Sequence, residues 1–143
     1  MNKKKLMIIM GFIFVFAMII LLSKLGTIFA QECRIIKIHG RTEHPSIIIE
    51  PETIFLSKGD CVVWFNRFTA EDVKVTFEEG KKCLDVTNAP IGFSLNAQSC
   101  YVTSWVPFAG TSSLRFIEKG TYDYTVEAKN IGGVKAKGRI VVE

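Results

Sequence analysis

Short apolar runs separated by turn residues dominate the chain from Cys33 onward. Residues 73–77, V-K-V-T-F, alternate apolar and polar side chains, which is the pattern of a β-strand with one buried face. Residues 61–66, C-V-V-W-F-N, are apolar on both faces and predict a central strand that is covered on each side. No amphipathic helical segment of comparable clarity interrupts these runs, so the sequence predicts an all-β domain.

Turn residues divide this domain into about eight short strands, which is the spacing of a Greek-key β-sandwich or barrel. The strand-like runs are 34–39, 47–49, 53–56, 61–66, 73–77, 101–106, 114–116, 122–128 and 137–142. Between them, residues 81–98 are the least regular part, because Asn88, Pro90 and Gly92 break any periodicity. A short helix and an ordered loop both remain open for that segment.

The first 30 residues have a different character. Three lysines stand in residues 1–5, an uninterrupted apolar run of 17 fills residues 6–22, and the segment ends in the small residue Ala30. This is the order of a secretory signal peptide, although the run is also long enough to span a bilayer as a helix. We therefore expect a hydrophobic signal or membrane-anchor helix within residues 1–30 and one domain over residues 31–143.

Both interpretations of the leader export the domain, because N-terminal lysines stay in the cytoplasm. We expect the bacterial periplasm or cell surface, with an inner-membrane anchor through residues 6–22 if the leader is not cleaved. The net charge of +4 comes from the leader, which holds four lysines and no acid and leaves 14 basic and 14 acidic side chains in the domain. A neutral domain without a basic block gives no reason to expect nucleic-acid binding.

All four cysteines lie in the exported part, where thiols are oxidised to disulfides. No C-x-x-C motif is present, so neither haem attachment nor a thioredoxin-type dithiol has its signature. The preferred bridge joins Cys83 to Cys100, since both flank the irregular segment. The four cysteines are separated by 28, 22 and 17 residues along the chain, which is unlike the close spacing of a thiolate metal site.

Three blocks together resemble the cupredoxins, the blue copper family. They are E-P-E-T-I-F-L with K-G-D over residues 50–60, V-V-W-F-N over 62–66, and the last thirty residues with G-T-Y-D-Y at 120–124. The resemblance covers about half of the exported chain and implies a cupredoxin-like Greek-key β-sandwich. It also implies that the first strand lies beside the strand opened by Cys61, which allows a Cys33–Cys61 bridge; a free or partner-bonded Cys33 is the alternative.

The resemblance fails at the copper ligands. The family's first histidine falls at Asp72 or Val73, its cysteine at Val126, its second histidine at Lys129, and its axial methionine within residues 132–134, which are G-G-V. A copper site of this type needs a thiolate and two imidazoles. We therefore expect a scaffold that has lost its standard site, with no metal at those positions and no cofactor.

A non-standard metal site is the alternative. His39 and His44 are the only histidines, five residues apart across a turn that includes Glu43, and could together hold copper or zinc. Exposed histidines of a turn are the plainer interpretation. For catalysis, adjacent carboxylates such as Glu71 and Asp72 point to opposite faces of a strand. No serine stands in a recognisable hydrolase motif, so we expect no catalytic residues and no enzyme activity.

The segment Trp105, Val106, Pro107 and Phe108 is the candidate interaction surface, because aromatic-rich patches often contact proteins. The alternative is that these residues pack a small second core with Phe93 and Tyr101. Together the observations predict a non-enzymatic accessory or interaction domain with a protein partner on the extracytoplasmic side. The resemblance associates it with a redox or respiratory assembly. The alternatives are a copper-binding electron-transfer or metal-handling protein and, more weakly, a ligand-binding or adhesion module.

Overall fold

A computed structural model describes residues 32–41, 43–78 and 83–143. The expected hydrophobic helix at residues 6–22 lies outside these ranges, so the prediction of a signal or anchor stays a prediction. Within the described ranges no helix combines the length and the apolar character that a bilayer crossing needs.

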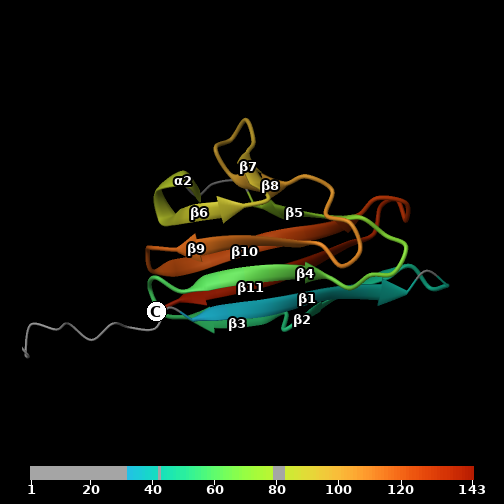
Figure 1. Ribbon diagram of the computed structural model, residues 1–143, viewed down its shortest axis with the longest axis horizontal. Coiled ribbons are helices and arrows are strands. Elements are labelled where there is room, and N and C mark those ends of the chain that lie inside the picture. The colour runs from blue at the N-terminus through green and yellow to red at the C-terminus, as the bar shows by residue number, and fades with distance from the viewer. Residues whose placement is uncertain (1–31, 42, 79–82) are drawn as a thin grey trace, which may run out of the picture. The chain divides into compact units, whose positions relative to one another are not determined.

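The described chain is a sandwich of two β-sheets (Figure 1). Sheet A has the strand order β2-β1-β4-β9-β6, and sheet B has the order β3-β11-β10-β5-β8-β7. The elements are β1 (Cys33–Arg41), β2 (Ser46–Glu50), β3 (Thr53–Leu56), β4 (Cys61–Asn66), β5 (Val73–Phe77), α2 (Cys83–Val86), β6 (Thr87–Ile91), β7 (Phe93–Leu95), β8 (Tyr101–Thr103), β9 (Thr111–Phe116), β10 (Gly120–Ala128) and β11 (Lys135–Val142). The all-β prediction is therefore confirmed.

Strand alternation places the core between the sheets. In β4 the inward side chains Val62, Trp64 and Asn66 are buried, whereas Val63 and Phe65 on the opposite face are only half-buried. The prediction that this strand is covered on both faces is wrong, because the outer face of sheet A lies at the molecular surface. Apolar residues on that face are thus available for contact.

An aromatic cluster fills the centre of the core. The ring of Trp64 meets the rings of Phe77, Phe93 and Tyr124 edge to face, with centroids 5.8, 5.2 and 5.5 Å apart. Such geometry is favourable for aromatic quadrupoles and adds to the gain from burial. Phe93 packs against this main core from the segment that the sequence left undefined, and not in a separate small core as the sequence alternative expected.

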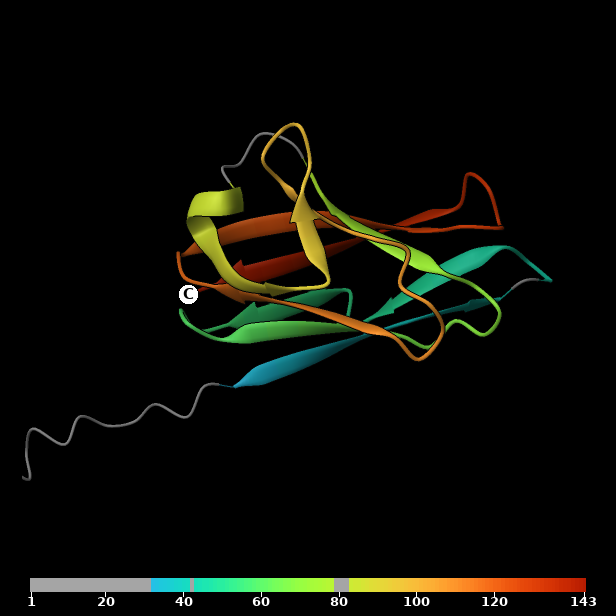
Figure 2. The ribbon, with the colours of Figure 1, turned by 45° about the horizontal axis from the view of Figure 1, so that its top comes forward.

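The irregular segment contains more structure than expected. It forms the one-turn helix α2, the edge strand β6 and the β7–β8 hairpin, which lie together at one side of the sandwich in both views (Figure 2). Strand β6 tolerates Pro90 because it is an edge strand with an irregular register to β9 between Asn88 and Ile91.

Two disulfides close the domain. Cys83 of α2 is bonded to Cys100 just before β8, with Cα atoms 4.9 Å apart, and Cys33 of β1 is bonded to Cys61 of β4, with Cα atoms 4.5 Å apart. These are the preferred and the resemblance-based pairing of the sequence analysis. No cysteine remains free, so neither a partner-bonded Cys33 nor a thiolate metal site is present. Two disulfides indicate an oxidising, extracytoplasmic environment.

Candidate functional site

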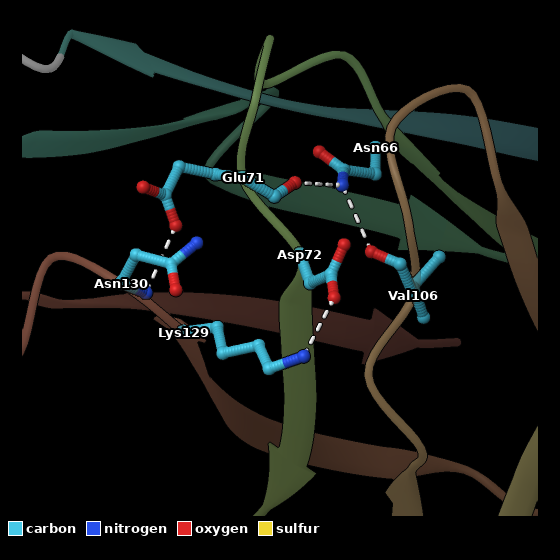
Figure 3. A network of polar contacts seen from close by, with 6 residues as sticks. All are labelled: Asn66, Glu71, Asp72, Val106, Lys129 and Asn130. Atoms are coloured by element: carbon cyan, nitrogen blue, oxygen red, sulfur yellow. Dashed lines mark hydrogen bonds and ion pairs between the residues drawn. The ribbon is translucent and has the colours of Figure 1, made fainter.

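A buried asparagine organises the end of the sandwich at which β4 ends and β5 begins. Asn66 is fully buried, and its amide group donates hydrogen bonds to the backbone oxygens of Glu71 and Val106, at 2.8 and 2.9 Å (Figure 3). Its side-chain oxygen accepts a bond of 2.9 Å from the backbone N–H of Phe68. One side chain therefore fixes two loops, residues 67–72 and residues 104–110.

Backbone bonds reinforce this arrangement. The N–H of Asn66 donates to the oxygen of Gly110, and the N–H of Ala109 donates to the oxygen of Asn66. Val73 and Val106 exchange two further backbone bonds, at 3.0 and 2.7 Å. Backbone hydrogen bonds therefore tie both loops to the ends of the sheet strands.

Acidic side chains connect the same end to the loop after β10. The Nζ atom of Lys129 lies 3.1 Å from Oδ2 of Asp72, and the backbone N–H of Lys129 donates to the oxygen of Asp72 at 2.9 Å (Figure 3). The buried carboxylate of Glu71 accepts a 3.0 Å bond from the backbone N–H of Asn130. This directed backbone donor satisfies one of the two side-chain oxygens of Glu71.

This ion pair stands at the positions where the resemblance predicts two copper-binding histidines. Lys129 stands at the second of them, and the first falls at Asp72 or at its fully buried neighbour Val73. Val126, at the expected cysteine position, is fully buried and pairs with Val75. A protonated lysine has no lone pair to give a metal, and its charge repels a cation. Within the described residues no group of three or more His, Cys, Asp and Glu side chains is arranged to hold a metal ion.

The two histidines do not form a cluster with Glu43. His39 lies on β1, with its Nε2 atom 3.7 Å from Oε2 of Glu50 on β2. His44 and Glu43 are exposed in the turn that follows β1. The structure therefore gives His39 a different carboxylate neighbour from the one that sequence proximity suggested.

The expected interaction segment is divided between surface and core. Val106 is buried through its bridge to Val73, so its inclusion in a contact surface is wrong. Trp105 is half-buried, with Nζ of Lys74 positioned 4.2 Å from the centre of its ring. Pro107 is exposed, and Phe108 is 54% exposed. Within this segment, only the Pro107–Phe108 tip presents an open apolar surface.

Comparison with solved structures identifies the architecture. A reduced tryptophan-to-tyrosine mutant of amicyanin aligns over 81% of this chain and 87% of its own, with a TM-score of 0.50 and 20% sequence identity. The fold is that of the cupredoxins. A copper(I) form of a methionine-to-glutamine mutant of amicyanin aligns over 78% of this chain and 82% of its own, with a TM-score of 0.49 and 21% identity. No family model and no curated protein matches the sequence.

The cupredoxin-like domain thus has the expected sandwich, and its described residues form no evident copper site. Sequence reasoning missed the organising role of Asn66 and the buried carboxylate of Glu71. An asparagine that ends an apolar strand is the signal that was available for Asn66, because a polar group carried into the core by strand alternation must find partners there. For Glu71 the sequence carries no such signal, since it precedes the strand in a polar loop.

Proposed function

We propose that this chain is a non-enzymatic, extracytoplasmic cupredoxin-like domain that works as an accessory or interaction subunit. The observation that carries the proposal is the residue set at the expected ligand positions: Lys129 at the second histidine position is ion-paired to Asp72, and Val126 at the cysteine position is buried. These residues stabilise the loop end of the sandwich, and none of them is a donor for copper in the geometry of the family.

A rigid scaffold supports a binding role. The two disulfides and the Asn66 network restrain both the strands and the loops, so little conformational entropy is lost when a partner binds. The exported location rests on the disulfides together with the predicted leader, and membrane attachment through residues 6–22 is part of the proposal. The association with a redox or respiratory assembly is taken from the resemblance alone.

The test is isolation of the full chain, with an affinity tag at its C-terminus, from gently cross-linked cells of its source. The proposal predicts co-isolation of a defined protein partner in near-stoichiometric amount, with no copper or zinc above the background of an unrelated exported protein. Isolation of the chain alone with one metal ion per molecule would contradict it and favour the metal-handling alternative.

A further inference from the structure

The outer face of sheet A carries a row of three apolar residues and one serine that crosses four strands. The strand register aligns Ile35 of β1 with Val63 of β4, Val63 with Ser113 of β9, and Ser113 with Ile91 of β6. Residues paired in this way share one face and lie about 5 Å from their neighbours. Ile35 is 56% exposed and Ile91 66% exposed, so both ends of the row are open to contact.

Cationic side chains flank this row on both sides. Lys37 lies beside the half-buried Phe65 in the next row, and Arg115 lies beside Cys61 in the row before. Neither cation is in an ion pair with any described residue. Lys37 is exposed, whereas Arg115 is half-buried, and its Nε atom is buried without a hydrogen-bond partner in that part of the chain. Glu50, the acid opposite Lys37 on β2, lies within ion-pair distance of His39.

The outer face of sheet B is different, because its cations are in ion pairs within the domain. The ion pairs are Arg139–Asp123 at 2.6 Å, Lys137–Glu78 at 2.8 Å, Lys74–Glu127 at 3.4 Å and Lys135–Glu127 at 3.5 Å. Hydrogen bonding to these carboxylates raises the pKa of both Lys137 and Arg139. All four of these cations are therefore paired, although they share three carboxylates. On sheet A, by contrast, Lys37 and Arg115 are in no ion pair and lie on either side of exposed apolar groups.

We propose that the outer face of sheet A docks a protein partner whose contact surface carries apolar side chains flanked by aspartate or glutamate. Such a partner covers the Ile35–Ile91 row and supplies carboxylates to Lys37 and Arg115, which is the complementarity that steers association. A second copy of this chain fits less well, since a symmetric contact would bring the same cations toward each other. The inference rests on the proposed interaction function and assigns it a surface.

The experiment is site-specific photo-cross-linking in cells that produce the full chain. p-Benzoylphenylalanine replaces Ile91 on sheet A, Phe55 on the exposed edge of sheet B, or Phe108 at the loop tip. Each of the three variants carries the photo-cross-linker at one position and is otherwise wild type. The variant with the cross-linker at position 91 is also made with the additional substitution Lys37→Glu. Lys119→Glu is the matched control, because it reverses the charge of an exposed lysine outside sheet A. Equal melting temperatures verify that each variant is folded.

The proposal predicts one discrete protein adduct from position 91, with a cross-linked peptide that contains acidic residues beside apolar ones. Lys37→Glu lowers its yield about tenfold or more, whereas Lys119→Glu does not. The surface assignment would be overturned if position 91 cross-linked to lipid or to a second copy of this chain. It would also be overturned if Lys37→Glu left the yield of the protein adduct unchanged. A protein adduct from position 108 or 55 alone would overturn it and leave the proposed function standing, whereas no protein adduct from any position would count against both.

Discussion

Tyr124 carries a hydroxyl group into the core, where it has no hydrogen-bond partner among the described residues. Burial of this side chain raises the pKa of the phenol above its ordinary value of 10.0. In the folded state the Tyr124 hydroxyl therefore keeps its proton at a pH at which the same hydroxyl is deprotonated in the unfolded chain. The resulting stability is present below about pH 10 and falls as the pH rises above that value, because the unfolded state then binds fewer protons.

Substitution Tyr124→Phe tests this account. Below about pH 9 we expect a change in unfolding free energy of less than about 1 kcal/mol, since the substitution removes an unpaired polar group from the core. Above about pH 10 the wild type should lose stability with pH more steeply than the variant, measured by urea unfolding at several pH values. Identical slopes in the two proteins would contradict the assignment of a neutral, buried phenol.

Trp64 is the residue on which the aromatic core depends most. It is almost fully buried and contacts three other rings, so Trp64→Ala should lower the free energy of unfolding by about 3–5 kcal/mol. Phe55→Ala is the control, because Phe55 is 61% exposed and should cost about 0.5 kcal/mol or less. Urea unfolding measures both, and a loss below about 1 kcal/mol for Trp64→Ala would argue against the core assignment.

At the scale of elements, the Cys83–Cys100 bridge ties α2 to the start of β8. A closed loop of this size stabilises a protein by about 3 kcal/mol in the chain-entropy model. Cys83→Ser and Cys100→Ser should therefore destabilise the domain to similar extents, and the double variant should lose no more than either single one. Additive losses in thermal or urea unfolding would show that the two cysteines act independently.

The loops at the end of the sandwich depend on Asn66. Asn66→Ala removes both donors to the buried oxygens of Glu71 and Val106, and we expect a loss of about 2 kcal/mol or more. Asn88→Ala, at an exposed position of β6, is the matched control and should change stability by less than about 0.5 kcal/mol. Hydrogen exchange should also become faster in residues 67–72 and 104–110; unchanged exchange there would contradict the role of Asn66.

Elements with alternating patterns could be predicted from the sequence, and elements held by irregular pairing could not. Residues 73–77 alternate and form β5 at the expected bounds, because burial of one face decides both pattern and structure. β6 contains Asn88 and Pro90, and only its neighbour β9 makes it a strand. The Asn66 network likewise joins residues up to 40 positions apart, so local pattern carries no information about its partners.

At the scale of the whole molecule, the domain keeps the cupredoxin-like sandwich and replaces the expected ligands with a valine in the core and an ion pair at the loop end. The sequence alone shows that the copper ligands are replaced, because the residue at each ligand position follows from the blocks that resemble the family. That Asp72 and Lys129 contact each other was not predicted, because their proximity depends on how the loops before β5 and after β10 meet.

The central claim is that this scaffold works without copper. The measurement that tests it most directly is the copper and zinc content of the oxidised full chain, with its visible spectrum, after exposure to each metal and desalting. We expect near-zero retention and no charge-transfer band, unchanged by His39→Ala and His44→Ala. One metal ion per chain, lost when His39 and His44 are replaced, would contradict the account and place a non-standard metal site beside β1.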